Sequence, residues 1–413
     1  MRRSQRGIAL VLVMVGLLAL VAMAGLAIDT GRIMTNKARL QSTVDAAALA
    51  AAKVLGQTGS QDQAYEAARL IFVANRARFP DLASVNLGRG DVTFSRELYP
   101  FTAGTPDPRF VRVRVGAMPF AATLTSVLGI AELRTGASAV AGPSPSLDNP
   151  GGEICDLAPI FICGDTAAGQ AGNWGYAEGQ VVGLKLDSNN SAVGPGNFQL
   201  LRLPGDEGGA DIRRNLAGAS PACTAINDTL PLNTEPGNKA GPTAQGLNTR
   251  FDVYQGAGQR LSRTDYPPDV VTTPRDLQLS LQCANDVCQV VQGGQRTPIL
   301  NSSQLSSNFS TYTNRLRSNL VDNSYGVINR RVIAVPVGQC PAGPGRTEVT
   351  VSGFACFFLL QQVEQSDATI IGEFVRGCGS RGNPGGEVPN PNPGTATGPY
   401  VIQLYDDDAS SDS

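Results

Sequence analysis

The sequence contains no histidine, a single tryptophan and few charged residues. The absence of histidine removes the Ser-His-Asp triad, the Cys-His dyad and every histidine-ligated metal site. Charged residues make up 16% of the chain, and the 33 basic residues nearly balance the 35 acidic ones. A basic surface that would attract nucleic acid is therefore not expected. We expect no catalytic site, no cofactor, no metal and no nucleic-acid partner.

One long apolar run stands at the start of the chain, Ile8–Ile28, with 21 residues and no charge. A helix of that length measures roughly 31 Å, the thickness of a bilayer's hydrocarbon core. Helix-forming residues continue beyond the run, so we predict one helix from about Gly7 to Leu55. A cleaved signal peptide and a plain signal anchor are alternatives. Against cleavage, the run exceeds the usual apolar core of about 7–15 residues, and no turn signal follows it.

The residues that flank this run narrow the alternatives. An Arg-Gly pair precedes it, an Ile-Asp-x-Gly-Arg motif follows it, and an alanine-rich helix comes next. The motif residues are Arg6, Gly7, Asp29, Gly31, Arg32, Leu40, Gln41, Asp45, Ala46, Ala47, Ala48 and Leu49. In order and spacing, this segment resembles the amino-terminal segment of TadE/TadG-like proteins of the tight-adherence (Flp) pilus-assembly system.

The resemblance implies a membrane-anchored structural or assembly component without catalytic activity. Its partners would be the inner membrane and pilus subunits or other tight-adherence assembly proteins. Prepilin-like members are cleaved after a glycine and carry a glutamate five residues later. Here the fifth residue after Gly7 is Leu12, and no acidic residue comes before Asp29. The chain therefore resembles the TadG branch, which keeps its anchor.

The orientation in the membrane is predicted from the flanking charges and from the cysteines. The short arginine-bearing tail favours a cytoplasmic N-terminus, but Arg32, Lys37 and Arg39 nearly balance it. The eight cysteines and the long, weakly charged remainder favour translocation of everything after the span. We expect a single-pass protein of the bacterial inner membrane, with its C-terminal domain periplasmic or extracellular.

Two local features beyond the span each allow two interpretations. Asp29 and Arg32 are three residues apart and could form an ion pair, or they could simply be polar at the interface. The alanine-rich stretch Ala46–Ala52 has small side chains on every side. It could be an assembly face open to a cross-linker near Ala48, or it could pack on its own domain.

Residues 56–142 predict a membrane-proximal α+β segment. A helix is expected over Asp62–Phe79, and strands over Phe110–Val115 and Ala137–Gly142. The helix has an apolar stripe of Ala64, Ala68, Ile71, Phe72 and Phe79. In the first strand Arg112 and Arg114 alternate with valines, which predicts a solvated sheet face, or a grip on an acidic partner. Asp91–Ser95 resembles the metal motif of von Willebrand A domains, but no helix follows it and we assign it no metal.

A linker, 143–152, leads to a β-rich and loop-rich domain, 153–405, and an acidic tail, 406–413, expected to be disordered. Short strands separated by turns are expected, with one helix over Thr311–Leu320. The strands are Val181–Leu186, Phe198–Leu203, Arg331–Val337, Val349–Leu360, Thr369–Val375 and Tyr400–Tyr405. The glycine-rich segment 205–209 lacks a predicted strand–loop–helix setting, so no phosphate site is assigned to it. The fold class is α+β: the membrane helix, 1–55, continues into a small helix-plus-sheet domain, followed by a disulfide-bonded β-rich domain.

The candidate disulfide residues are Cys155, Cys163, Cys223, Cys283, Cys288, Cys340, Cys356 and Cys378. Pairing neighbours in sequence would join Cys155 to Cys163, Cys283 to Cys288 and Cys340 to Cys356, which is one of 105 arrangements. A zinc site is the alternative, but no Cys-x-x-Cys pair occurs.

Three functions therefore compete. A structural or assembly component of a tight-adherence pilus is the first. A membrane-tethered adhesin or binding module is the second, and a membrane-tethered hydrolase outside the cytoplasm is the third.

Overall fold

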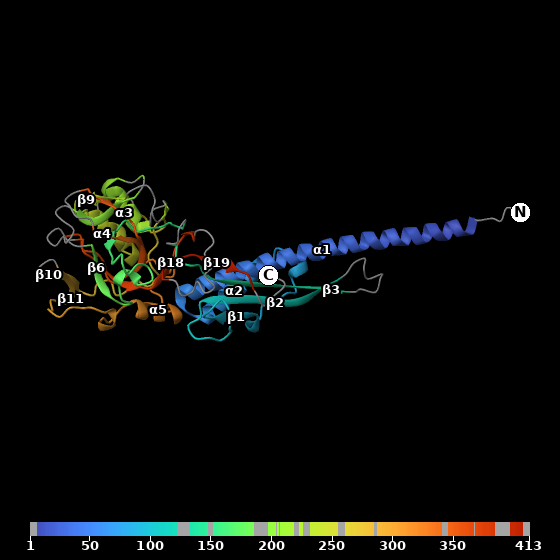
Figure 1. Cartoon of the computed structure of the whole chain (residues 1–413). Coiled ribbons are helices and arrows are strands. Elements are labelled where there is room, and N and C mark those ends of the chain that lie inside the picture. Colours follow the sequence, from blue (N-terminus) through green and yellow to red (C-terminus); the bar gives the residue numbers. More distant parts are fainter. Residues whose placement is uncertain are drawn as a thin grey trace. The chain divides into compact units, whose positions relative to one another are not determined.

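The computed structural model describes most of the chain and divides it into two compact units (Figure 1). Unit 1 consists of residues 1–55, 60–142 and 403–413, and unit 2 of residues 56–59 and 143–402. The described residues are 6–121, 132–147, 152–185, 197–203, 205, 207–218, 223–225, 232–254, 261–284, 287–340, 346–366, 368–384 and 397–407. The fold is mixed α+β, as the sequence predicts.

Helix α1, Arg6–Thr58, is one uninterrupted helix of 53 residues. It matches the predicted helix to within three residues at its C-terminal end. Gly59 then adopts a left-handed φ of 64°, which ends the helix, and Ser60 caps the next one. A residue with a Cβ would be strained at that φ, so glycine is suited to this turn.

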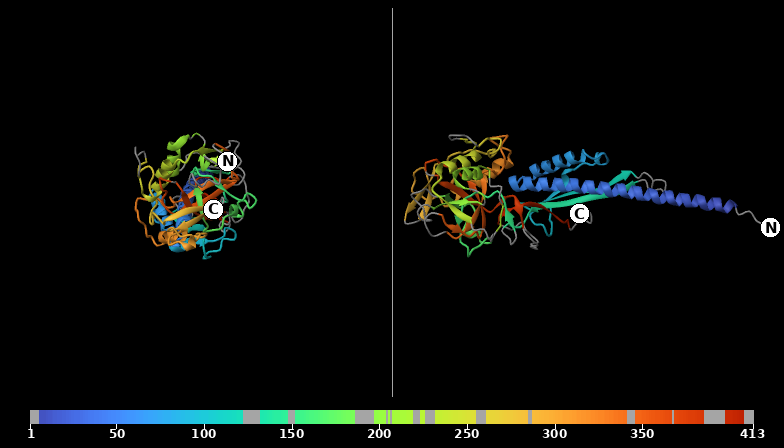
Figure 2. Two further views of the ribbon diagram at one scale, coloured as in Figure 1. Left: turned by 90° about the vertical axis from the view of Figure 1, so that its left-hand side faces the viewer. Right: turned by 90° about the horizontal axis from the view of Figure 1, so that it is seen from above.

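Helix α2, Gln61–Arg76, follows this turn, and it lies alongside the second half of α1 (Figures 1 and 2). Its buried residues are Ala64, Ala68 and Phe72. Ile71, predicted for the same stripe, is instead 37% exposed. The buried residues of α2 form one row at four-residue spacing, Ala64, Ala68 and Phe72, and Ile71 lies outside that row. The turns η1, Pro80–Leu82, and η2, Arg89–Asp91, lead on to the sheet.

The sheet of unit 1 has the strand order β1-β2-β3-β19. Strands β2, Phe110–Ala121, and β3, Glu132–Pro143, form a long antiparallel pair that extends well beyond the predicted strands. Strand β1, Val92–Ser95, pairs with β2 at one edge. The other edge is β19, Ile402–Tyr405, from the end of the chain. Strands from residues 92–143 and from residues 402–405 therefore build one sheet.

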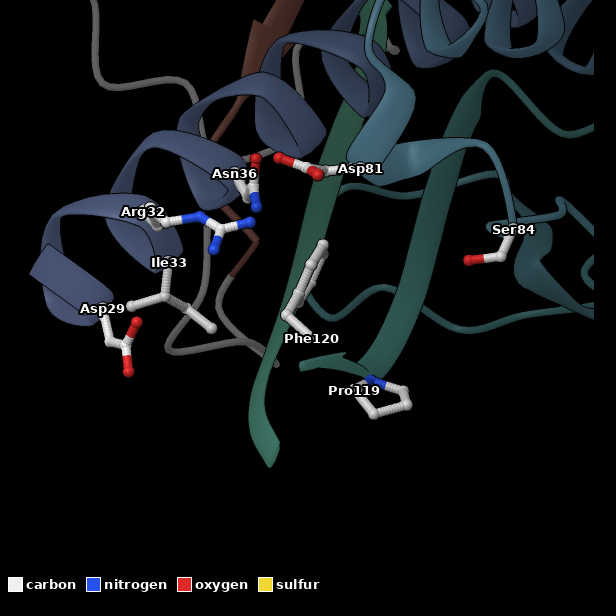
Figure 3. Close-up of a pocket in the computed structure, with 8 residues that line it drawn as sticks. All are labelled: Asp29, Arg32, Ile33, Asn36, Asp81, Ser84, Pro119 and Phe120. Carbon is white, nitrogen blue, oxygen red and sulfur yellow. The ribbon is translucent and has the colours of Figure 1, made fainter. Parts of the chain in front are cut away.

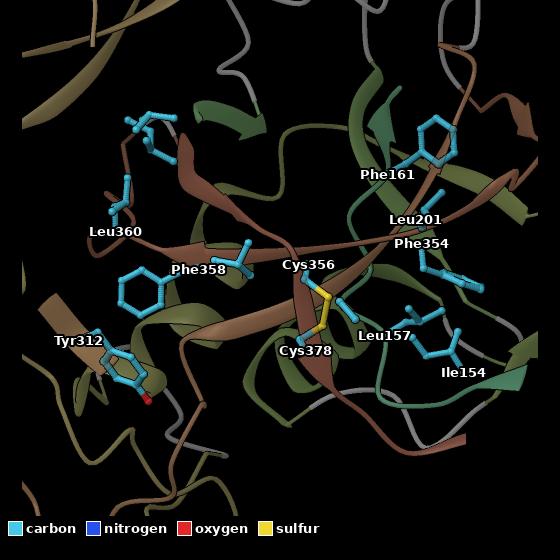
Figure 4. Close-up of a cluster of buried hydrophobic side chains, with 14 of the residues drawn as sticks. Ile154, Leu157, Phe161, Leu201, Tyr312, Phe354, Cys356, Phe358, Leu360 and Cys378 are labelled. Atoms are coloured by element: carbon cyan, nitrogen blue, oxygen red, sulfur yellow. A yellow bond between two sulfur atoms is a disulfide. The ribbon is translucent and has the colours of Figure 1, made fainter. Parts of the chain in front are cut away.

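The central sheet of unit 2 has five strands in the order β5-β12-β14-β15-β6. Every residue of β14, Gly353–Leu359, is buried. Phe354, Cys356 and Phe358 belong to one hydrophobic cluster, shown in Figure 4, whereas Ala355, Phe357 and Leu359 belong to a second. Because alternate side chains of a strand point to opposite faces, the central sheet has an apolar core on each face.

The remaining elements of unit 2 are short and surround this sheet. The other central strands are β5 Ile162–Cys163, β6 Val181–Lys185, β12 Val332–Gly338 and β15 Ile370–Val375. The smaller sheets contain β4 Glu153–Ile154, β7 Asn197–Arg202, β8 Thr224–Ala225, β9 Leu232–Pro236, β10 Leu279–Ala284, β11 Val287–Gln292, β13 Glu348–Val349, β16 Gly377–Gly379, β17 Gly382–Asn383 and β18 Gly398–Tyr400. The helices are η4 Asn173–Gly175, α3 Gly208–Gly218, α4 Ala240–Asn248, η5 Thr249–Phe251, η6 Ser302–Gln304 and α5 Phe309–Arg317.

Helices α3 and α4 correct the sequence analysis, which expected only the helix at α5. They pack against each other at Gly246, where an added Cβ would lie 2.5 Å from the Arg213 carbonyl oxygen. Two short helices that pack closely are stabilised by tertiary contacts rather than by helix propensity. Their glycines lower the helix propensity of the sequence, so the pattern did not predict helices here. Since β7 precedes α3, the glycine-rich segment does have a strand–loop–helix setting. At the start of α3 the carboxylate of Asp211, in the first turn of the helix, accepts a hydrogen bond from the Glu207 N–H at 2.7 Å.

Candidate functional site

The first half of α1 is an apolar helix. Its large side chains are not covered by any other part of the chain that the structure describes. Large apolar side chains from Leu10 to Ile28 are 53–70% exposed. The helix is long and apolar enough to cross a membrane, and only 6% of its most apolar 18-residue stretch is buried. An exposed apolar surface of this extent needs a non-aqueous environment. The helix therefore fits a single-pass membrane anchor.

The second half of α1 is the central element of unit 1. Leu40, Val44, Ala47, Ala48 and Ala51 are each 0% exposed. They recur at helical spacing and give α1 a continuous buried face. The alanine-rich stretch therefore packs on its own domain, and Ala48 is closed to a cross-linker. This finding corrects the expectation of an accessible face near Ala48.

The remaining motif residues border this buried face. Gln41 Nε2 donates to Asp45 Oδ1 and to the Ser138 carbonyl oxygen, both at 2.8 Å. This amide fastens α1 to strand β3. Burial raises the pKa of the Asp45 carboxyl, although the hydrogen bond from Gln41 acts in the opposite direction. Ala46 and Leu49 are half-buried, and Gly31 and Arg32 are exposed; Arg6 and Gly7 begin the helix.

Just beyond the apolar run, α1 forms one wall of a pocket of about 260 Å³ (Figure 3). The lining residues are Asp29, Arg32, Ile33, Asn36, Asp81, Ser84, Pro119 and Phe120. Asp29 is 3% exposed and Asn36 4%, although both follow a helix segment that is almost entirely exposed. The sequence motif contains Asp29 and Arg32, but it does not connect them with the η1 region or the end of β2. No local pattern could have done so, because these elements come together only through the tertiary fold.

The arginines of β2 have different environments. Arg114 is exposed, as predicted for a solvated face. Arg112 instead forms an ion pair with Asp407 at 2.6 Å, and its guanidinium carbon lies 4.0 Å from the centroid of the Phe101 ring. The Ser138 hydroxyl donates to the same carboxylate. The acidic partner of Arg112 thus comes from the chain itself.

Asp407 corrects the expectation that residues 406–413 form a disordered tail. Its side chain is 1% exposed. It lies two residues after the end of β19, so its ion pair with Arg112 of β2 helps to fasten the last strand to the sheet of unit 1. Asp408–Ser413 lie outside the described residues.

All eight cysteines form disulfides in unit 2. The pairs are Cys155–Cys223, Cys163–Cys340, Cys283–Cys288 and Cys356–Cys378. Only the Cys283–Cys288 pair agrees with pairing of sequence neighbours, because these residues face each other across the β10–β11 hairpin. The other pairs join segments that are distant in sequence. No group of three or more acidic or cysteine residues that could hold a metal occurs among the residues that the structure describes.

Unit 2 contains a buried polar cluster around Asp269. Its carboxylate accepts hydrogen bonds from the backbone N–H groups of Val271 and Arg331, both at 2.9 Å, and from the Tyr312 hydroxyl at 3.0 Å. Burial raises the pKa of Asp269 to about 6, although these hydrogen bonds and the charge of Arg331 act in the opposite direction. The Arg331 guanidinium donates to the Leu359 carbonyl oxygen instead of pairing with Asp269. These mutual contacts hold loops around the core, and we interpret the cluster as structural.

Comparison with known families identifies the N-terminal helix α1. Residues 7–54 match the family model described as "Putative Flp pilus-assembly TadE/G-like". The segment is TadE/G-like, as the motif residues indicated. The match coincides with helix α1 and links the chain to Flp pilus assembly. No curated protein and no solved structure matches the chain.

Proposed function

We propose that this protein is a membrane-anchored, non-catalytic structural or assembly component of a tight-adherence, Flp-type pilus system. One observation carries the proposal. The TadE/G-like segment, 7–54, coincides with a single helix that is apolar and exposed over its first half and built into a domain over its second. Such a helix couples the membrane rigidly to unit 1, because no flexible linker separates the span from the folded domain.

The proposed location is the bacterial inner membrane, with the N-terminus in the cytoplasm and both units on the other side. Support comes from the short arginine-bearing tail and from four disulfides, which form and persist in oxidising compartments. Protease treatment of spheroplasts tests this orientation. We expect digestion of the C-terminal region, and protection of that region would contradict the orientation.

The proposed anchor is not removed by processing after Gly7, because Leu12 stands where a processed chain would carry glutamate. The mass of the intact protein isolated from membranes tests this point. A mass that includes residues 1–7 is expected, and loss of those residues would place the chain with the processed members.

Deletion of the gene tests the proposed function itself. Loss of pili, restored by the full-length chain, is the expected result. A matched control variant replaces residues 1–28 with a cleavable signal sequence, which releases both units from the membrane; we expect it to fail to restore pili. Unchanged piliation with lost attachment would favour the adhesin alternative, and unchanged piliation and attachment would contradict both.

Partners of the alanine-rich helix can be sought from an accessible position. Ala48 is buried, but Lys53 on the same helix is exposed. A photo-reactive residue at position 53 is expected to cross-link a pilus subunit or another assembly protein. The same residue at position 48 is the control, and it should remain within the chain.

A further inference from the structure

We propose that the pocket between α1 and the end of β2 binds the headgroup of a zwitterionic phospholipid with a primary ammonium, of the phosphatidylethanolamine type. This inference rests on the proposed membrane anchoring, and it adds a ligand to the site where the anchor leaves the bilayer.

The pocket lies at the level of the headgroups. The apolar run ends at Ile28, and a helix rises about 1.5 Å per residue. Asp29 to Ile33 therefore occupy roughly the first 8 Å beyond the hydrocarbon core. The headgroup layer is about 5–8 Å thick on each side of a bilayer. Strand β2 reaches the same level, because Pro119 and Phe120 line the pocket opposite α1.

The dimensions of the pocket suit a headgroup. Its volume is about 260 Å³. At about 30 Å³ for each water-sized group, this volume holds roughly nine such groups. A phosphoethanolamine group has about eight non-hydrogen atoms, each no larger than a water molecule, so the pocket has room for it. Its attached acyl chains would lie beside the exposed apolar residues of α1, which begin directly below the pocket.

The charged residues of the pocket distinguish this headgroup from others. In Figure 3 the side chain of Arg32 extends from α1 toward Phe120, and Asp81 and Ser84 face the same space from the opposite wall. A guanidinium binds phosphate through charge-assisted hydrogen bonds, and carboxylates accept N–H bonds from an ammonium. Asp29 adds a second carboxylate to the lining. A trimethylated ammonium could not donate to these carboxylates, and an anionic headgroup would be repelled by them.

The test measures lipid binding to the full chain in detergent by native mass spectrometry. Dioleoyl phosphatidylethanolamine, phosphatidylcholine and phosphatidylglycerol are added separately, together with soluble phosphoethanolamine as a fourth arm. We expect one phosphatidylethanolamine to bind about tenfold more tightly than the other two lipids, consistent with one charge-assisted hydrogen bond. Soluble phosphoethanolamine should bind more weakly, because it lacks acyl chains. Equal binding of the three lipids, or a preference for phosphatidylglycerol, would overturn the proposal. Tighter binding of soluble phosphoethanolamine than of the lipid would show that the ligand of the pocket is not a lipid.

Variants locate the site. Arg32→Gln and Asp81→Asn should each lower phosphatidylethanolamine binding about tenfold. Arg114→Gln and Asp62→Asn change exposed residues of unit 1 outside the pocket and should leave binding unchanged. If Arg32→Gln does not fold, Arg32→Lys retains the cation but not the guanidinium fork, so its binding should fall by less than about tenfold and keep the preference for phosphatidylethanolamine. If none of the pocket variants changes the affinity for phosphatidylethanolamine, the pocket is not the binding site.

Carbonate extraction of the wild-type protein from membranes separates this inference from the proposed function. Protein that stays in the membrane but shows no lipid preference would overturn only the pocket proposal. Release of the wild-type protein by carbonate would contradict the anchoring on which both depend.

Discussion

The two units of this protein are stabilised in different ways. Unit 1 contains no cysteine and is organised around one long helix, whose buried face includes Ala47, Ala48 and Ala51. Unit 2 has short strands and helices, two apolar cores on opposite faces of one sheet, and four disulfides. The TadE/G-like match lies within unit 1 and its anchor. The comparison indicates that a local helix motif specifies unit 1, whereas unit 2 depends on contacts between distant segments.

Removal of the longest disulfide loop should have the largest effect on stability, and only in unit 2. Cys163 and Cys340 are 177 residues apart, whereas Cys283 and Cys288 are 5 apart. On the loop-entropy model, Cys163→Ser with Cys340→Ser lowers the free energy of unfolding of unit 2 by roughly 5 kcal/mol, and Cys283→Ser with Cys288→Ser by about 2 kcal/mol. Urea unfolding in detergent, followed by fluorescence of Trp174, measures both. Trp174 is the only tryptophan and is buried in unit 2. Equal losses for the two pairs would contradict the loop-length argument.

Unit 2 should also lose stability as pH rises through the range between about 4 and 6. The pKa of Asp269 is raised from 3.8 to about 6 in the folded protein. The folded state therefore binds a proton in this range that the unfolded state has lost, so the free energy of unfolding falls with increasing pH. The fall is at most about 3 kcal/mol, from 1.36 kcal/mol per pKa unit. The fall is complete only after the pH has risen through this folded pKa, at about pH 7.

Urea unfolding of unit 2 at a series of pH values measures this dependence. Asp269→Asn does not titrate and should remove most of the slope between pH 4 and 6. Burial also raises the pKa of Glu373, which contributes a slope of the same sign. An unchanged slope in Asp269→Asn would show that other groups are responsible.

In unit 1, loss of the ion pair at the C-terminal strand should cost less, about 2–3 kcal/mol, because the Arg112 side chain keeps some contact with solvent. Asp407→Asn leaves the half-buried Arg112 without its carboxylate partner, and breaking such a pair is destabilising. The neighbouring Asp406 is exposed, so Asp406→Asn is the matched control. Hydrogen exchange of β3 measures the effect: exchange should be faster in Asp407→Asn alone. Equal protection in both variants would mean that the strand is held by other contacts.

The same ion pair shows where prediction from sequence ends. The long helix α1 could be predicted, because its apolar run, helix formers and motif residues all lie within one segment. Strand β19 could be predicted as a strand, but not as a member of the sheet of unit 1, since nothing local connects Asp407 with Arg112. The disulfides follow the same rule: only the hairpin pair, Cys283–Cys288, joins neighbours in sequence. Helices α3 and α4 were missed because their glycines and proline lower helix propensity, whereas their packing at Gly246 compensates for it.

The smallest effect is expected from overfilling the face on which α1 packs, and it distinguishes a core from an assembly surface. Ala48 is 0% exposed, so Ala48→Leu adds three carbon atoms where the packing leaves no room; such overpacking costs about 1–3 kcal/mol. Lys53→Leu makes an apolar substitution on the exposed side of the same helix and should change stability by less than about 0.5 kcal/mol. Hydrogen exchange of α1 and β3 in detergent compares the two. If Ala48→Leu is tolerated while Lys53→Leu destabilises unit 1, the alanine-rich face is not the core, and the sheet must be held by the Gln41 contact and the C-terminal strand instead.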